Sequence, residues 1–358
     1  MNVLLMTLFT FLHPADRPLE TIQVSGLEFE RVPSHERFLP WGFNYDRDDQ
    51  GHLIEDYWET DWPRVQGDFQ EMKALGANVV RVHLQFGKFM KSATEPNEKA
   101  LEQLGKLLTL AETTGLYLDL TGLGCYHKAD VPEWYDALTE EERWSAQARF
   151  WEAVASRGSE SPAVFCYDLM NEPIVPGGQR KPGDWLGPAF AGKHYVQVIS
   201  LDQKDRPRPQ VAKAWIKTLV TAIRKHDSRH LITVGLVDWS LNRPGLTSGF
   251  VPAEVAEDLD FVSVHLYPES GKVDEALKTL KGFQVGKSVV IEETFPLKCS
   301  FDEFERFLDL ASEQNVGVIG FYWGKSPEEL RDAKSISDAL MSKWLELFSR
   351  RARTAGRP

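Results

Sequence analysis

The sequence predicts an α/β protein of the (β/α)8, or TIM-barrel, class: a single domain with an enlarged loop after its fourth strand. Three observations predict this fold. Short apolar runs alternate with amphipathic segments along the chain, and the alternation passes through eight units without an internal break. The 358 residues also fit, because they exceed the ~250 residues typical of this fold by an amount that loop insertions can supply.

The eight expected strands are nearly continuous runs of Val, Ile, Leu and Phe, as strands buried on both faces should be. They are residues 38–44, 77–83, 116–120, 164–169, 231–237, 261–266, 288–293 and 316–323. Amphipathic periodicity predicts helices at 64–75, 97–114, 139–156, 210–226, 252–256, 273–280, 300–313 and 336–351. Two of them open with a capping box, in which Thr139 or Ser300 is followed three residues later by Glu. Left-handed C-caps are expected at Gly76, Gly115 and Gly282.

The expected domain organisation follows from this pattern. Residues 1–20 would be a signal peptide or an N-terminal extension, 21–350 the barrel domain, and 351–358 a basic C-terminal tail. The first segment is apolar but lacks a positive n-region and a clear A-x-A site. We therefore expect an extracellular or periplasmic protein, with the cytoplasm as the alternative. The insertion at 174–209 is expected to wall a pocket, because loops after strands form the active face of this fold.

Composition narrows the possible partners. A net charge of -12 and a pI near 5.3 argue against nucleic acid, whose phosphates favour a basic face. Beyond the N-terminal segment, no apolar run is long enough to span a membrane. The three cysteines, Cys125, Cys166 and Cys299, lack metal-ligand spacing, and no phosphate-binding or dinucleotide motif stands out. We expect a monomer with no cofactor, no metal, and no nucleic-acid or membrane partner.

Two acidic sites far apart in the chain stand at strand ends. Glu172 follows the fourth strand, and the pair Glu292-Glu293 ends the seventh. A carboxylate at the end of a buried strand is costly unless the site uses it, and the C-terminal ends of strands are where barrels place their chemistry. Two such carboxylates facing one pocket are typical of a glycosidase, in which one protonates the leaving oxygen and the other attacks or activates water. Asn171 could add a hydrogen bond to a sugar hydroxyl beside the reacting carbon.

With their neighbours, these residues resemble glycoside hydrolase family 5, the cellulase/mannanase family of the retaining (β/α)8 glycosidase clan. The resemblance extends over about residues 38–323. Its motifs are Asn171-Glu172-Pro173 after strand 4, Arg81 on strand 2, His265 and Tyr267 on strand 6, Glu293 on strand 7 and Trp323 on strand 8.

The resemblance implies that Glu172 is the general acid/base and Glu293 the nucleophile. Strand alternation would point only one of Glu292 and Glu293 into the barrel, and Glu293 is preferred because the family motif with paired Glu uses the second. Arg81 would bond to the nucleophile and keep it ionised. The expected substrate is a β-linked oligo- or polysaccharide.

The same resemblance assigns the remaining substrate-binding residues. Asn171 would hold the sugar 2-hydroxyl, and Tyr267 would hydrogen-bond the nucleophile. His265 would line the pocket beside the acid/base. The ring of Trp323 would form the floor of the subsite that binds the sugar whose bond is cut. The family commonly ends its third strand in His, where this chain has Asp119-Leu120-Thr121, so that contact is either lost or made by His127.

Two rival functions remain open from the sequence. One is a carbohydrate-binding barrel that has lost hydrolysis, keeping aromatic walls but misplacing a carboxylate. The other is a metal-dependent hydrolase, for which only His83 and His265 are well placed. The sugar, the linkage and the choice between internal and terminal cleavage are also open. The last depends on whether the insertion after strand 4 closes one end of the groove.

Overall fold

Eight parallel strands close into a barrel in the computed structural model, which describes residues 18–47, 51–243, 246–332 and 335–354. The predicted fold is confirmed, and the strands follow one another around the barrel in chain order. They are β4 (Trp41–Tyr45), β5 (Val79–Gln85), β6 (Tyr117–Gly124), β7 (Val164–Asn171), β10 (Leu231–Val237), β11 (Val262–His265), β12 (Val289–Glu293) and β13 (Gly317–Trp323).

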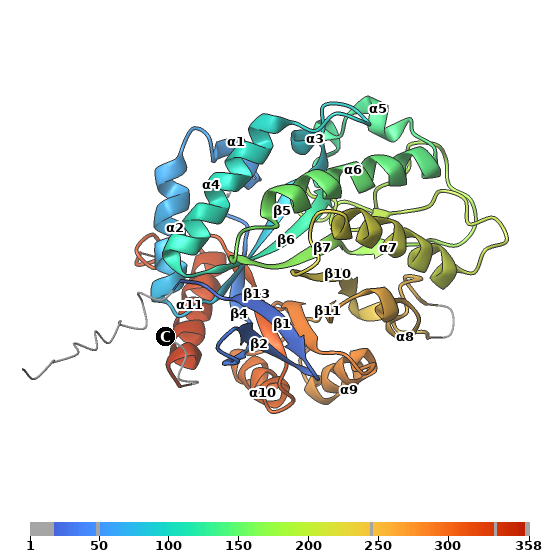
Figure 1. Cartoon of the computed structure of the whole chain (residues 1–358). Coiled ribbons are helices and arrows are strands. Elements are labelled where there is room, and N and C mark those ends of the chain that lie inside the picture. Colours follow the sequence, from blue (N-terminus) through green and yellow to red (C-terminus); the bar gives the residue numbers. More distant parts are fainter. Residues whose placement is uncertain (1–17, 48–50, 244–245, 333–334, 355–358) are drawn as a thin grey trace, which may run out of the picture.

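Helices surround these strands (Figure 1). The outer helices are α2 (Trp62–Ala74), α4 (Glu98–Thr114), α6 (Glu140–Gly158), α7 (Arg208–Arg224), α8 (Pro252–Val255), α9 (Val273–Phe283), α10 (Phe301–Ser312) and α11 (Ile336–Thr354). Loops after strands carry the short helices α1 (Ile54–Tyr57), α3 (Phe86–Phe89) and α5 (Glu133–Asp136) and the 3₁₀ turns η2 (Lys128–Asp130) and η3 (Asp238–Ser240), and a third 3₁₀ turn, η4 (Ala256–Asp258), follows α8.

The predicted helix boundaries hold in most places. Both capping boxes form, since the Thr139 and Ser300 hydroxyls each accept from the backbone N–H three residues later. Gly115 is a left-handed C-cap with φ 74°. The prediction for Gly282 is wrong, because this residue lies inside α9, where a Cβ would come within 2.7 Å of Leu241. A packing contact explains that glycine.

A small antiparallel sheet covers the N-terminal end of the barrel, and the sequence analysis did not anticipate it. It consists of β1 (Thr21–Ser25), β2 (Glu28–Val32) and β3 (Arg37–Phe38), and Figure 1 shows β1 and β2 lying across the barrel strands. Its buried side chains, Ile22 and Phe29 among them, pack against residues at the starts of the barrel strands, such as Phe165. This apolar cluster closes the end opposite the predicted active face.

The C-terminal end of the chain differs from the predicted division. Helix α11 continues to Thr354, so the expected tail from residue 351 begins as helix. Arg350 and Arg351 form ion pairs with Glu305 and Asp309 on α10, at 2.8 and 2.7 Å. The apolar segment at the N-terminus lies outside the described residues apart from its last few, so its role as a signal peptide stays a prediction.

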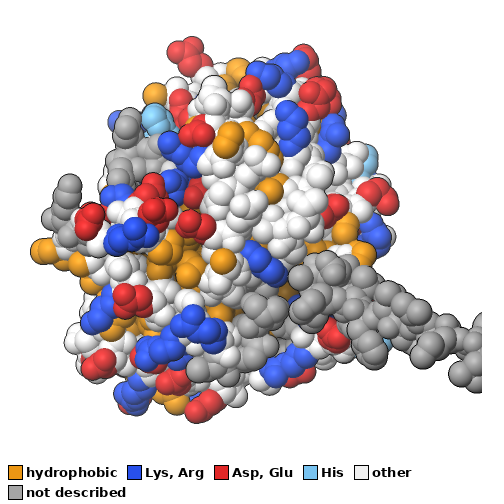
Figure 2. Space-filling view, turned by 90° about the vertical axis from the view of Figure 1, so that its left-hand side faces the viewer, with side chains coloured by type: hydrophobic (Ala, Val, Ile, Leu, Met, Phe, Trp, Pro, Cys, Tyr) orange, Lys and Arg blue, Asp and Glu red, His pale blue; other side chains and the backbone are white. Residues whose placement is uncertain are grey.

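The charged surface is mixed on the face shown in Figure 2, where Lys and Arg side chains alternate with Asp and Glu. Within the described ranges, none of the helices combines the length and the apolar character needed to cross a bilayer.

Candidate active site

The C-terminal end of the barrel is organised around one fully buried guanidinium. Arg81 on β5 donates from Nη1 to Glu293 Oε1 at 2.6 Å and to Asn44 Oδ1 at 2.9 Å. Its Nη2 donates to Asp168 Oδ2 at 2.7 Å and to Asn171 Oδ1 at 3.0 Å. Burial works against the charge, but the surrounding carboxylates keep the pKa of Arg81 well above its usual value. A permanent cation therefore ties four strands together.

Glu293, the last residue of β12, is held at both of its oxygens. Arg81 donates to Oε1, and the Tyr267 hydroxyl donates to Oε2 at 2.9 Å. His265 Nδ1 lies 3.4 Å from the same Oε2. A carboxylate bonded in this way is oriented and stabilised as an anion, which is the state that a nucleophile needs.

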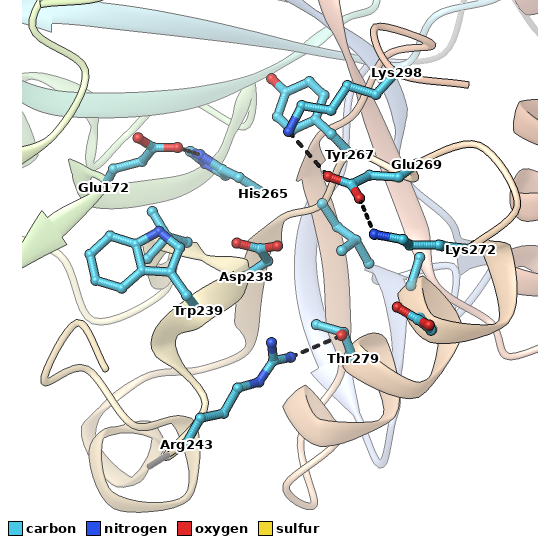
Figure 3. A pocket seen from close by; sticks show the side chains of 14 residues that line it. Glu172, Asp238, Trp239, Arg243, His265, Tyr267, Glu269, Lys272, Thr279 and Lys298 are labelled. Atoms are coloured by element: carbon cyan, nitrogen blue, oxygen red, sulfur yellow. Dashed lines mark hydrogen bonds and ion pairs between the residues drawn. The ribbon is translucent and has the colours of Figure 1, made fainter. Parts of the chain in front are cut away.

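Glu172 stands immediately after β7 in a left-handed backbone conformation, with φ 47°. Such a conformation is uncommon for a residue other than glycine, and it persists where the surroundings fix it. Here the Glu172 N–H donates to the Gly235 carbonyl at 2.9 Å, and the Glu172 carbonyl accepts from Gln197 N at 3.3 Å. Oε1 of its side chain lies 2.9 Å from His265 Nδ1 (Figure 3).

His265, at the end of β11, connects the two candidate carboxylates. Burial alone would lower the pKa of His265, but the charge of Glu293 and hydrogen bonds to Glu172 and Glu292 raise it to about 10. The imidazolium form therefore dominates at neutral pH. Ligand atoms of Glu172, His265 and Glu293 all lie within 4.8 Å of one another, so the two carboxyl groups share one site.

Asp168 and Asn171 fix Arg81 from the side of β7. Asp168 accepts from Thr121 Oγ1 at 2.9 Å and from Gly235 N at 2.7 Å, in addition to Arg81. Asn171 donates from Nδ2 to the Tyr195 carbonyl at 3.0 Å. An amide nitrogen has two hydrogens, so one N–H of Asn171 remains for a sugar hydroxyl.

Glu292 does not point away from the barrel, as simple alternation would require. The pairing register between β11 and β12 shifts at His265, and both members of the couplet are buried. Glu293 lines a cavity, whereas Glu292 lies deeper, with Oε2 3.8 Å from Arg81 Nη2 and 3.7 Å from His265 Nε2. This depth makes Glu293 the member that a substrate can reach.

A second buried acid, Asp119 on β6, lies beside Glu292. Burial raises the pKa of Asp119 well above its ordinary value, and the charge of Glu292 adds to this effect. Burial acts the same way on Glu292, but the charge of Arg81 and the nearby His265 and Asp119 lower the pKa of Glu292 instead. A protonated Asp119 next to an ionised Glu292 follows from these directions.

His127 does not replace the histidine that the family usually has after strand 3, because its Nε2 lies 2.6 Å from the Gly51 carbonyl. His83 on β5 stands near Glu293 instead. Its Nε2 lies 3.2 Å from Asn44 Oδ1 and its Nδ1 lies 2.5 Å from the Tyr126 hydroxyl. Burial lowers the pKa of His83 well below its ordinary value, and the charge of Arg81 lowers it further, so His83 is neutral.

The structure corrects the expectation for Trp323. Its side chain is fully buried and packs against Phe43, with ring centroids 5.6 Å apart. It is not among the residues that line the cavities beside the carboxylates. Phe321, two residues earlier on β13, lines a cavity together with Glu293. The strand-end aromatic that faces the site is therefore Phe321.

The carboxylates stand between two cavities of unequal size. Glu172 lines a cavity of about 340 Å³ with Trp239 and Asp238 of η3 and with charged residues such as Lys298 (Figure 3). Glu293 lines a second cavity of about 20 Å³. The residues around that smaller cavity are Tyr45, Asp46, Arg47, His52, Leu53, Ile54, His83, Tyr126, Lys193, Tyr195 and Phe321.

Among the described residues, two triads could offer ligand atoms to a metal ion: Glu172 with His265 and Glu293, and Asp119 with Cys166 and Glu292. In both, the positive charge of Arg81 or His265 already stands beside the acidic groups. A dication would have to bind against that charge. The sites suit an anionic nucleophile and a proton donor better than a metal.

The closed barrel and the carboxyl pair at the ends of two of its strands define the class of the protein as a two-carboxylate glycosidase barrel. The family described as Cellulase (glycosyl hydrolase family 5) has a sequence model that matches residues 45–350. The chain belongs to glycosyl hydrolase family 5, as its motifs indicated.

Relatives in this family extend the comparison. The chain is 27% identical over 275 residues to mannan endo-1,4-β-mannosidase A of Podospora anserina, covering 71% of this chain and 55% of the relative. It is 25% identical over 204 residues to mannan endo-1,4-β-mannosidase A of Emericella nidulans, covering 53% and 45%. The chain thus spans about half the length of these curated relatives.

Solved structures share the fold at lower identity. The exo-β-1,4-mannosidase from Opitutaceae bacterium strain TAV5 matches with a TM-score of 0.66 and 19% identity, over 93% of this chain and 62% of the other. The endo-1,4-β-mannanase of Rhizomucor miehei matches with a TM-score of 0.63 and 18% identity, over 92% and 99%.

Proposed function

We propose that the protein is a retaining β-glycoside hydrolase that acts on β-1,4-linked mannosides. The observation that carries the proposal is the pair Glu172 and Glu293, whose nearest oxygens lie within 4.8 Å in a site built around Arg81. Retaining enzymes need carboxyl groups ~5–5.5 Å apart, against ~6.5–9.5 Å for inversion. The curated relatives that are named as mannan endo-1,4-β-mannosidases support a mannoside as the substrate.

In the first step, Glu293 attacks the anomeric carbon and forms a covalent glycosyl-enzyme, while Glu172 gives its proton to the departing oxygen. Arg81 and Tyr267 hold the two oxygens of Glu293, so little reorganisation is needed as its charge is consumed. In the second step, Glu172 takes a proton from water, and the water oxygen displaces Glu293 to release the sugar with its original configuration.

His265 controls which oxygen of Glu172 carries the transferred proton. As an imidazolium, it donates from Nδ1 to Oε1 of Glu172. Oε2 is then the oxygen that holds the proton for the leaving group. Asn171 contributes its remaining N–H to the 2-hydroxyl of the sugar, a contact that strengthens in the transition state.

The test is hydrolysis of a panel of β-linked polysaccharides and aryl β-glycosides by the wild type, Glu293→Ala and Glu172→Gln. We expect β-mannosides to be cleaved, and NMR to detect the β-anomer of the product first. Glu293→Ala should abolish turnover. Glu172→Gln should slow substrates with poor leaving groups by ~10²–10⁴-fold and spare activated aryl glycosides more.

The same panel of substrates distinguishes the proposed hydrolase from a carbohydrate-binding barrel that has lost hydrolysis. A carbohydrate-binding barrel without hydrolysis would bind mannan but release no sugar from any substrate. Equal activity of Glu172→Gln and wild type on both kinds of substrate would contradict the acid/base assignment.

A further inference from the structure

The two candidate catalytic carboxylates face cavities of very different size, and this asymmetry has a consequence for substrate direction. On the proposed mechanism, the nucleophile contacts the anomeric carbon of the sugar that stays, and the acid/base contacts the oxygen of the part that leaves. Glu293 lines the cavity of about 20 Å³ and Glu172 the cavity of about 340 Å³. The narrower cavity therefore belongs to the retained sugar, and the larger cavity, which Figure 3 shows, belongs to the leaving chain.

A largely buried ion pair lines the narrower cavity. Lys193, from the insertion after β7, contacts Asp46 Oδ1 through Nζ at 2.6 Å, and Asp46 directly follows β4. Both residues line the same small cavity as Glu293. Their side chains are only 8% and 18% exposed, so water screens the pair weakly. The pair connects the loop after the first barrel strand to the insertion after the fourth.

A rigid turn holds Lys193 in place. Phe190 and Lys193 exchange two backbone hydrogen bonds, of 2.9 and 3.0 Å, across Ala191 and Gly192. The positive φ values of Ala191 and Gly192, 48° and 81°, are those of a two-residue type I′ hairpin turn. The next residue, His194, donates its N–H to the Tyr126 carbonyl at 2.8 Å. The lysine is thus fixed by the backbone on both sides.

The residue that follows Asp46 is also anchored. Arg47 donates to Asp68 Oδ1 at 2.8 Å and to Glu329 Oε1 at 2.6 Å, and its side chain is largely buried. Asp68 also accepts from the Tyr45 hydroxyl at 2.7 Å.

We propose that the Asp46–Lys193 ion pair ends the cleft one sugar beyond the bond that is cut, so that the protein removes single sugars from the non-reducing end of a β-linked chain. This inference rests on the proposed function. The small cavity measures only about 20 Å³, so the side chains around it must move apart to admit the first sugar. A second sugar would have to pass through the ion pair.

The same ion pair suits recognition of a chain end. A terminal sugar carries a hydroxyl where an internal unit carries the next sugar. Lys193 can donate to that hydroxyl and Asp46 can accept from it. The remainder of the chain extends into the larger cavity, where Trp239 offers an aromatic surface beside Glu172.

The experiment follows β-1,4-mannohexaose that carries a fluorescent label at its reducing end. We expect wild-type protein to release mannose, with the label passing in order through chains shortened by one unit. Early labelled dimers and trimers would overturn the inference. If an aryl β-mannoside is hydrolysed at the same time, the proposed function survives that result. If neither the mannoside nor the matching glucan series is cleaved, both proposals fall.

Lys193→Met tests the role of the ion pair, because it keeps the length of the side chain and removes its charge. Release of terminal mannose should fall about tenfold, the effect of losing one hydrogen bond to a charged group, and products of internal cleavage should appear. Lys225→Ala, which breaks the 2.5 Å ion pair with Glu152 between α7 and α6, is the control and should leave the product pattern unchanged. Thermal melts check that each variant folds. Exclusive terminal release by Lys193→Met would overturn the assignment.

Discussion

The two ends of the barrel differ in what fills them. At the N-terminal end, the rings of Phe29, Phe165 and Phe261 meet with centroids 5.3–5.5 Å apart in an apolar cluster. At the C-terminal end, Arg81 is buried among carboxylates such as Asp168 and Glu293. Apolar burial stabilises the fold, whereas buried charge costs free energy unless it is paired. Stability and reactivity are therefore concentrated at opposite ends of the same strands.

The largest expected effect comes from Arg81→Met. It leaves buried carboxylates unpaired, which typically costs ~3–5 kcal/mol of unfolding free energy, and turnover should fall at least ~10²-fold because Glu293 loses its cation. Urea unfolding and kcat on an aryl β-mannoside measure the two effects. Arg143→Met is the matched control: Arg143 is also buried and donates to the Tyr135 carbonyl at 2.7 Å. If both variants lose the same share of kcat, the positive charge of Arg81 at the site is not the cause of the loss.

Phe165→Ala examines the opposite end of the barrel. Removing this ring from the aromatic cluster should lower the unfolding free energy by ~3–5 kcal/mol. The kcat of the folded fraction should stay at the wild-type value, because the residue lies at the start of β7 and far along the strand from Asn171. Chemical unfolding with parallel activity assays checks both. A tenfold fall in kcat would show that the two ends are coupled.

Gly235→Ala places a small probe inside the charged end. A Cβ at this position would lie 3.0 Å from both Arg81 Nη2 and His265 Nε2, and 3.2 Å from Glu292 Oε2. Overpacking of this kind costs ~1–3 kcal/mol, and displacement of Arg81 should reduce kcat. Gly105→Ala on α4 is the control. A Cβ at residue 105 would lie no closer than 3.5 Å to the Arg157 side chain, so this substitution should be neutral or stabilising. A wild-type kcat for Gly235→Ala would contradict this prediction, because it would mean that Arg81 and its partners accommodate the added methyl group without loss of activity.

The pH dependence of stability tests the charged end of the barrel in another way. The pKa of His265 is about 10, above the ordinary value of about 6.5. Its charge therefore contributes stability that is complete below pH ~6.5 and disappears as the pH rises through ~10. The difference in unfolding free energy between the wild type and His265→Gln should shrink over that range. A difference that stays constant from pH 6 to 10 would contradict an imidazolium at this position.

The sequence anticipated the barrel because buried parallel strands leave an unmistakable apolar pattern. It also anticipated which side chains meet at the strand ends: the structure brings Glu172, Glu293, Arg81 and His265 together as expected. Their roles remain the proposal made above.

What the sequence did not indicate depends on details that patterns do not encode. Trp323 and Phe321 differ by two positions, and only the local path of β13 decides which of them faces the cavity. Glu292 is buried beside Glu293 because of a register shift that no alternation rule contains. The Asp46–Lys193 contact joins residues 147 positions apart, and neither residue type is unusual in a loop. An aspartate such as Asp168 inside an apolar run was the one neglected signal, since it must be paired to be buried.

The sheet formed by β1, β2 and β3 implies an order of events during synthesis. Its apolar residues Ile22 and Phe29 are made before the barrel strands, but Phe29 packs on Phe165 and Phe261, which are made much later. Until those strands exist, the early hairpin has nothing to dock on. This sheet can therefore seal the barrel only after the strands that carry Phe165 and Phe261 have been made.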